Sequence, residues 1–286
     1  MALGNLEVVR SGLGFLEAPR WHKGKLWFVD FSSRLVQSMG DDGTLHRHAY
    51  VAGQPSGIGF KPDGSVLVVS THERHLLEFA EGRPLQRVAD VGRTYQANLN
   101  DMVVDQMGRA YISPYNADQP ERPPPDYRPS TPLIMVDIDG TVKVAADDLA
   151  MPNGSVISAD GSTLIVAESL GARLTAFDVG VGGSLLNRRT FAEVPGRIPD
   201  GITLDAEGAM WIGCPMSEEF VRVKEGGQVC DVIRTPGRWA VACVLGGSDG
   251  RTLYCLTAKT TYADHLEGRA VGAIEKVTVA VPADGF

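Results

Sequence analysis

Short apolar runs rich in β-branched and aromatic residues recur along the whole chain and are separated by turn residues. Clear examples are Leu26 to Val29, Val66 to Val69, Leu164 to Val166 and Leu253 to Leu256. Such side chains suit a pleated, half-buried strand, and no segment keeps a helical period for long. The pattern therefore predicts an all-β protein.

A turn containing glycine precedes these runs and recurs six times. The copies are His22-Lys23-Gly24, Asp63-Gly64, Gln106-Met107-Gly108, Asp160-Gly161, Glu207-Gly208 and Asp249-Gly250. Their glycines follow one another at intervals of 40 to 53 residues, which is the length of a four-stranded propeller blade. We therefore expect a six-bladed β-propeller with four-stranded antiparallel blades, forming a single domain over residues 1–286.

The longest interval between turns contains the segment Pro114 to Pro132, which holds five further prolines. Proline cannot donate to a sheet ladder, so this segment is predicted to be an extended loop or lid. Two other segments, Glu7 to Arg10 and the alternating stretch Ala273 to Val281, are candidates for the strand that closes the ring. The pattern does not decide between them.

Composition sets limits on the class of protein. The chain has 286 residues, of which 43% are hydrophobic and 22% charged, as in globular proteins with a full core. A net charge of −8 without a Lys and Arg cluster argues against nucleic-acid partners. No stretch approaches 18 apolar residues and no basic leader is present, which predicts a cytoplasmic protein without membrane spans. The four cysteines lack a CxxC spacing and are predicted to be reduced and buried.

The turn glycines also define a repeat register that points to a functional site. The residues eight positions before them, or seven in the first copy, are Glu17, Ser56, Asn100, Asn153, Asp200 and Ala242. Equivalent positions of different blades converge on one end of the central channel of a propeller. Any one Asn or Asp here could be an ordinary turn residue, but four polar side chains in one register favour a common centre.

These four side chains, Glu17, Asn100, Asn153 and Asp200, offer two carboxylates and two amide oxygens. Hard oxygen donors without His or Cys suit Ca²⁺, Mg²⁺ or Mn²⁺ better than tetrahedral Zn²⁺. The register therefore predicts one divalent metal, with Ca²⁺ favoured because it tolerates irregular coordination and water ligands.

Two other motifs are better explained by structure than by chemistry. The run Gly246 to Gly250 formally matches the G-x-S-x-G nucleophile elbow, but it contains a repeated turn and no helix follows, so Ser248 is interpreted as a turn residue. His72 and His75 lie between a predicted strand and Leu76, where a solvated turn is expected rather than a metal site.

The chain resembles the SMP-30/gluconolactonase family at these same residues. The matching motifs are Leu16-Glu17-Ala18-Pro19-Arg20-Trp21, Leu99-Asn100-Asp101, Pro152-Asn153-Gly154, Pro199-Asp200-Gly201-Ile202 and the segment Arg238 to Ala258. The resemblance implies a six-bladed, metal-dependent lactonase in which Glu17, Asn153 and Asp200 bind the metal directly. It also implies that Asn100 contacts both metal and substrate.

The chain departs from this family near the substrate. Sugar-lactone members have an Arg two residues before the equivalent of Asn100, whereas this chain has Asn98. Pro114-Tyr115-Asn116 stands where the family carries a substrate-binding Glu. We expect Asn98 and Asn100 to contact the substrate, in a pocket that differs from that of the sugar lactonases.

The predicted function is hydrolysis of a small lactone. The metal would polarise the ring carbonyl, Asp200 would remove a proton from the attacking water, and Asn100 would orient the carbonyl or the oxyanion. Two alternatives remain open at this point: a phosphotriesterase-like hydrolase that uses the same site, and a non-enzymatic propeller whose metal is structural. The sequence does not give the oligomeric state.

Overall fold

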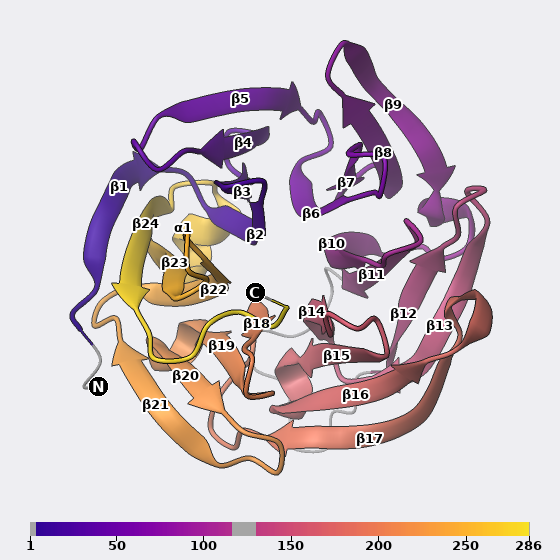
Figure 1. Ribbon diagram of the computed structural model, residues 1–286. Helices are drawn as coiled ribbons and strands as arrows, with labels where there is room; N and C mark the ends of the chain where they lie inside the picture. The colour runs from indigo at the N-terminus through magenta and orange to yellow at the C-terminus, as the bar shows by residue number, and fades with distance from the viewer. Residues whose placement is uncertain (1–3, 116–129, 286) are drawn as a thin grey trace.

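The protein is described by a computed structural model that covers residues 4–115 and 130–285 (Figure 1). Six four-stranded antiparallel sheets are arranged around a central axis, so the predicted six-bladed β-propeller is confirmed. Within the described residues there is one short α-helix, α1 (Tyr262–Leu266), and no helix is long and apolar enough to cross a membrane.

The strands follow the chain blade by blade, from the inner to the outer edge of each sheet. Blade 1 contains β2 (Leu16–His22), β3 (Lys25–Asp30), β4 (Leu35–Met39) and β5 (Leu45–Tyr50). Blade 2 contains β6 (Pro55–Phe60), β7 (Val66–Ser70), β8 (His75–Ala80) and β9 (Arg83–Asp90). Blade 3 contains β10 (Asn98–Val104), β11 (Ala110–Tyr115), β12 (Thr131–Val136) and β13 (Val142–Leu149).

The second half of the ring repeats this order. Blade 4 contains β14 (Pro152–Ile157), β15 (Thr163–Glu168), β16 (Arg173–Val179) and β17 (Leu185–Glu193). Blade 5 contains β18 (Ile202–Leu204), β19 (Met210–Cys214), β20 (Glu219–Val223) and β21 (Val229–Arg234). Blade 6 contains β22 (Trp239–Gly246), β23 (Thr252–Lys259), β24 (Val271–Thr278) and β1 (Glu7–Leu13). Single 3-10 turns cover Val91–Arg93, Ser169–Gly171, Val181–Gly183 and Pro215–Ser217.

The six predicted turn glycines each lie in the hairpin between the first and second strands of a blade. Their φ angles run from 69° at Gly250 to 93° at Gly108. This left-handed region favours glycine because a Cβ atom is strained there. The repeat in the sequence therefore corresponds to the same hairpin turn in every blade, and all six turns lie at one face of the ring.

Ring closure uses both candidate segments in one sheet. The N-terminal strand β1 is the outermost strand of blade 6 and pairs antiparallel with β24, with Glu7 opposite Lys276. The strand β24 ends at Thr278, so the prediction that it continues to Val281 was wrong. The reason is that the chain leaves the sheet there and begins a tail.

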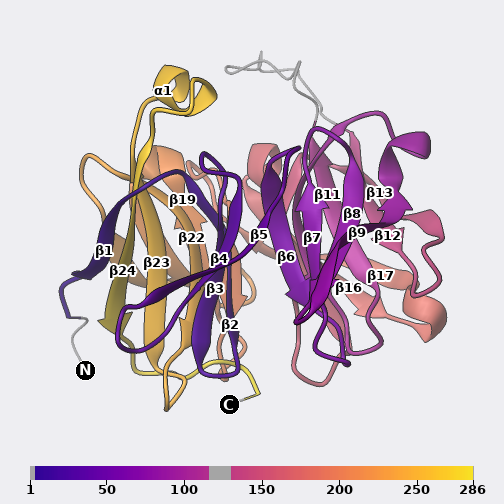
Figure 2. The same cartoon turned by 90° about the horizontal axis from the view of Figure 1, so that it is seen from above.

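This C-terminal tail, residues 279–285, crosses the face of the ring that carries the turn glycines (Figure 2). Ala283 N donates to the carbonyl of Gly250 at 2.9 Å in blade 6, and Asp284 N donates to that of Leu204 at 3.1 Å in blade 5. In blade 4, Ala159 N donates to Asp284 Oδ2 at 2.7 Å. The tail thus connects three blades at the face opposite α1.

Both ends of the segment predicted to be an extended loop, Pro114 to Pro132, lie in strands. Pro114 lies in β11 and Pro132 in β12, while residues 116–129 lie outside the described residues. The pairing of β11 with β12 ends at Ile112 and Ile134. Both prolines are therefore strand residues beyond the paired part of the ladder, where the missing N–H costs no hydrogen bond between these two strands.

The core consists of six clusters of buried side chains, each formed by two neighbouring blades. The prediction of buried, free cysteines is right for Cys214, Cys243 and Cys255. It is wrong for Cys230, which is exposed because it lies on β21, the outer strand of blade 5.

Candidate functional site

The four residues picked out by the repeat register lie at the beginnings of inner strands, at the face of the ring away from the turn glycines. Glu17 is the second residue of β2, Asn100 the third of β10 and Asn153 the second of β14. Asp200 precedes β18 by two residues. Ser56 and Ala242, the two remaining members of the register, lie in β6 and β22.

Irregular strand pairing next to Glu17 and Asn100 sets the direction of their side chains. The pairing of β2 with β3 skips between Glu17 and Arg20, and that of β10 with β11 skips between Leu99 and Met102. Just after Glu17, Ala18 has a φ of 47°, which is uncommon for a residue other than glycine. Bulges of this kind bend a strand and redirect its side chains. The local backbone is therefore shaped for the site rather than for regular pairing.

Two glycines let the inner strands approach closely. A Cβ on Gly154 would lie 2.5 Å from the carbonyl oxygen of Asp200, and a Cβ on Gly201 would lie 2.2 Å from the Cβ of Ala242. Because these are backbone or short side-chain atoms, nothing there can move aside cheaply. Gly154 allows Asn153 and Asp200 to come together from blades 4 and 5, and Gly201 allows blades 5 and 6 to approach beside Asp200.

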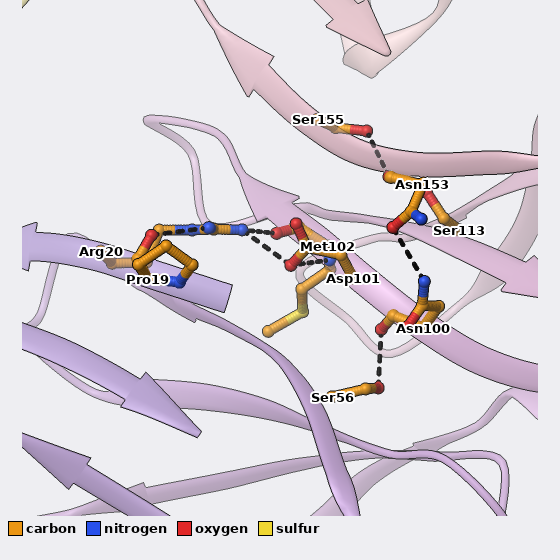
Figure 3. A network of polar contacts seen from close by, with 9 residues as sticks. All are labelled: Pro19, Arg20, Ser56, Asn100, Asp101, Met102, Ser113, Asn153 and Ser155. Carbon is orange, nitrogen blue, oxygen red and sulfur yellow. Dashed lines mark hydrogen bonds and ion pairs between the residues drawn. The ribbon is translucent and has the colours of Figure 1, made fainter. Parts of the chain in front are cut away.

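Hydrogen bonds connect three of the four side chains, and a charge interaction connects the fourth to them. Asn100 Nδ2 donates to Asn153 Oδ1 at 2.9 Å, and the two amides face one another in Figure 3. The Asn153 side chain also hydrogen-bonds the carboxylate of Asp200, and the negative charge of Asp200 acts on Glu17. The structure thus brings together four residues that span more than 180 positions in the sequence.

Three serines hold this arrangement from blade to blade. Ser56 Oγ donates to the carbonyl of Asn100 at 2.8 Å, and Ser113 Oγ donates to that of Asn153 at 2.7 Å (Figure 3). Ser169 Oγ donates to the carbonyl of Pro199 at 2.7 Å, next to Asp200. Each serine comes from the blade before the residue that it fixes. Sequence reasoning missed Ser113, which lies within β11, and Ser169, which follows β15, because neither is at the repeat position used to find the site.

A third carboxylate lies beside the site. Asp101 is buried and forms an ion pair with Arg20 at 2.9 Å, and Arg20 also donates to the carbonyl of Met102 (Figure 3). The two partners are 81 positions apart in the sequence. Both belong to motifs noted above, but only the fold shows that they pair.

Buried negative charge dominates the electrostatics. Burial and, after it, the charge of Asp101 together raise the pKa of Asp200 to about 8, although the hydrogen bond from Asn153 opposes them. Burial, and then the charges of Asp200 and Asp101, hold the pKa of Glu17 well above its usual range. In the part of the chain that the structure describes, no ion pair joins Glu17 or Asp200 to a lysine or arginine.

The chemistry of this donor set fits a divalent cation. Glu17 and Asp200 are partly buried and have no cationic partner within residues 4–115 and 130–285, so each raises the cost of ionising the other, and a bound cation would relieve that cost. The described residues contain no group of three or more His, Cys, Asp or Glu side chains that could hold a metal ion. A metal at this place would therefore need the amide oxygens of Asn100 and Asn153 in addition to the carboxylates, a set that suits Ca²⁺, Mg²⁺ or Mn²⁺.

The raised pKa of Asp200 predicts how the metal-free protein responds to pH. An unfolded Asp loses its proton near pH 4, whereas folded Asp200 keeps it until about pH 8. Unfolding therefore releases a proton between these values, and stability should fall as pH rises through this window. After treatment with a chelator, we expect the Tm to fall by about 5 °C or more between pH 5 and pH 8, as measured by calorimetry.

The control for this experiment is the exposed residue Asp160, whose pKa is lowered to about 2 by hydrogen bonds from Ser158 and Ser162. Asp160→Asn should leave the slope of Tm against pH unchanged, because this carboxylate is ionised throughout the window. Asp200→Asn should flatten the slope. A Tm that rises with pH in the chelated wild type would contradict the assignment.

Asn98, predicted to contact the substrate, lies opposite Tyr115 in the pairing of β10 with β11. Its side chain hydrogen-bonds the Tyr115 hydroxyl group. The position is at the same face as Asn100, but part of the hydrogen-bonding capacity of Asn98 is already used. Contact of Asn98 with a substrate remains a prediction.

The competing motifs take structural roles. Ser248 lies in the turn between β22 and β23, and a strand follows it. His72 hydrogen-bonds Gln54, whereas His75 lies 3.9 Å from Asp90, so the two histidines have separate partners.

Comparisons with known proteins agree with this architecture. Residues 15–259 match the model of the SMP-30/Gluconolactonase/LRE-like region. A 6-deoxy-6-sulfogluconolactonase of Pseudomonas putida is 28% identical over 207 residues, covering 71% of this chain and 68% of the relative. A pentonolactonase of Haloferax volcanii is 24% identical over 292 residues, covering 96% and 94%.

Among solved structures, a calcium-binding regucalcin from Agrobacterium tumefaciens has the same fold. Its TM-score is 0.76 at 17% identity, with 99% of this chain and 98% of that chain covered. The match to the family model extends over all four site residues, from Glu17 to Asp200. The chain belongs to the SMP-30/gluconolactonase/LRE-like family.

Proposed function

We propose that the protein is a metal-dependent lactonase. The observation that carries this proposal is the convergence of two partly buried carboxylates, Glu17 and Asp200, with the amides of Asn100 and Asn153. The two lactonase relatives support the reaction class. The substrate would be a small lactone, and the product the corresponding hydroxy acid.

Glu17, Asn153 and Asp200 would bind the metal directly, and Asn100 would contact both the metal and the substrate. When bound, a divalent ion supplies Lewis acidity toward the carbonyl oxygen of the lactone. Asp200 would bind the metal through one carboxylate oxygen and accept a proton from the attacking water through the other. The new bond forms between water oxygen and carbonyl carbon, the ring C–O bond breaks, and the proton on Asp200 passes to the leaving alkoxide.

Asn100 would stabilise the developing oxyanion. Its Nδ2 atom has two N–H groups, of which one donates to Asn153 Oδ1. The second N–H group would donate to the carbonyl oxygen of the substrate. The hydrogen bond from Ser56 to the Asn100 carbonyl fixes the backbone, so that the amide is positioned before the substrate binds.

Metal reconstitution tests the proposal. The protein is stripped with a chelator and assayed against γ-butyrolactone derivatives, δ-lactones and a phosphotriester, alone or with Ca²⁺, Mg²⁺, Mn²⁺ or Zn²⁺. We expect lactone hydrolysis to be lost on stripping and restored by divalent metal, most effectively by Ca²⁺. Faster turnover of the phosphotriester would favour the phosphotriesterase alternative. Calcium-dependent stability without turnover of any substrate would instead indicate a structural metal.

A further inference from the structure

The connection between β23 and β24 departs from the repeat at the face that carries the site. Blades 1, 2, 4 and 5 join their second and third strands with four residues, whereas blade 6 uses residues 260–270 and forms α1 (Figure 2). The Thr261 hydroxyl accepts from Asp264 N at 3.1 Å, and Arg269 Nε donates to Asp264 Oδ1 at 2.9 Å. The insertion is therefore held in a defined shape.

His265 of α1 lies against three aromatic rings. Its ring centroid is 4.2 Å from that of Phe15, 5.9 Å from that of Trp239 and 6.2 Å from that of Phe31. Phe15 and Trp239 contact one another edge to face at 6.4 Å. We call these four residues the aromatic wall. Phe15 is buried, whereas the other three keep part of their surface exposed.

The aromatic wall stands next to the carboxylates of the site. Phe15 precedes Glu17 by two residues, so the wall begins where β2 enters the site. Trp239 precedes Val241 by two residues, and the Val241 carbonyl accepts from Gly201 N at 3.1 Å, directly after Asp200. The wall therefore occupies the side of the site between blades 6 and 1.

His265 acts in this wall as a neutral ring. Its Nδ1 atom is buried and has no hydrogen-bond partner among the described residues. Burial lowers the pKa of His265, so the imidazole is uncharged at neutral pH. An uncharged imidazole that contacts Phe15 contributes an aromatic surface rather than a charge.

On the opposite side of the site, two of the described polar side chains already bond to one another. Tyr115 of blade 3 is close enough to Tyr262 of α1 for their charges to interact, so the insertion reaches toward blade 3. The Tyr115 hydroxyl is already hydrogen-bonded to the Asn98 side chain. A hydroxyl group that packs against the ring faces of Phe15 and Phe31 would lose water without gaining a hydrogen bond there.

We propose that the aromatic wall binds an apolar, ring-bearing substituent of the lactone, and thereby selects such lactones over hydroxylated ones. This inference rests on the proposed lactonase function. Flat apolar groups gain from offset or edge contacts with aromatic side chains, and they leave no polar group unpaired. His265 and Trp239 are then residues that determine specificity.

Two lactones with the same ring test the inference. β-Phenyl-γ-butyrolactone and β-hydroxy-γ-butyrolactone differ in a substituent that is not attached to the ester. In the metal-loaded wild type, we expect kcat/KM for the phenyl lactone to exceed that for the hydroxy lactone by at least about tenfold. His265→Ala should lower this ratio about five- to tenfold, mainly by raising KM for the phenyl lactone.

The conservative variant separates an aromatic role from a chemical one. His265→Phe should keep the ratio within about threefold of the wild type, because the ring surface is retained. His22→Ala is the matched control: His22 also stacks on an aromatic ring, with its centroid 3.7 Å from that of Phe60, but it lies next to the turn of Gly24 at the opposite face. This variant should leave the ratio unchanged.

Three outcomes overturn the inference while the proposed function stands: preference for the hydroxy lactone, an unchanged ratio in His265→Ala, or a His265→Phe variant that behaves like His265→Ala. If neither lactone is hydrolysed at any metal loading, the proposed function and the inference fail together.

Discussion

Asp200→Asn is expected to lower kcat for lactone hydrolysis by about 10³-fold or more, even at saturating metal. The amide has nearly the same shape as the carboxylate, so the close packing of Gly154 against the Asp200 backbone should persist. The substitution removes the carboxylate that takes the proton from water. The measurement is steady-state kinetics over a range of Ca²⁺ concentrations, together with metal affinity by calorimetry.

Asp160→Asn provides the comparison, because it removes a carboxylate from an exposed turn. It should retain the wild-type kcat. Metal affinity is also expected to weaken in Asp200→Asn, which is why the rate must be compared at saturation. If this variant keeps kcat within tenfold of the wild type once it is metal-loaded, the base lies elsewhere and the assignment to Asp200 is wrong.

Gly154→Ala should both destabilise the protein and weaken metal binding. The added Cβ would lie 2.5 Å from the Asp200 carbonyl oxygen, 2.8 Å from Gly201 Cα and 3.0 Å from Ile202 N. All three atoms belong to the backbone of blade 5, so relief requires blades 4 and 5 to separate. Overpacking of this kind costs about 1–3 kcal/mol or more. We expect a Tm lower by about 5 °C and a Ca²⁺ Kd raised at least tenfold.

Gly40→Ala is the matched substitution outside the site. Its added Cβ would lie 3.1 Å from Asp42 Oδ1, the end of an exposed side chain that can turn away. This variant should keep both Tm and Kd close to wild-type values. Equal effects of the two substitutions would mean that the approach of blades 4 and 5 is not what positions the metal ligands.

The architecture was predictable because one physical requirement repeats six times. Every first hairpin needs a left-handed residue, and glycine marks it at positions such as Gly64 and Gly161. Counting from these glycines located Glu17, Asn100, Asn153 and Asp200, since equivalent residues of a closed ring must share one end of it. The positions are brought together by the fold, whereas their role as metal ligands remains a prediction.

Other parts of the site were not predictable from the same period. Ser113 and Ser169 act on residues of the next blade, and no local pattern marks a serine that bonds a distant carbonyl. The Arg20 and Asp101 pair depends on two strands from different blades. His265 lies in an insertion that interrupts the repeat. Because the other blades have no equivalent residue, the repeat could not identify His265.

The place of β1 in blade 6 has a consequence for how the ring forms. Blades 1, 2, 4 and 5 are each made from one continuous stretch of fewer than 45 residues, whereas Glu7 pairs with Lys276 at the other end of the chain. At ribosomal speeds of about 5–20 residues per second, β1 waits on the order of tens of seconds for its partner to be synthesised. Throughout that time it is an unpaired edge, open to pairing with other chains. The strand carries Glu7 and Arg10, charged side chains of the kind that discourage such association. Ring closure is then the latest folding event, and the step most exposed to misassembly.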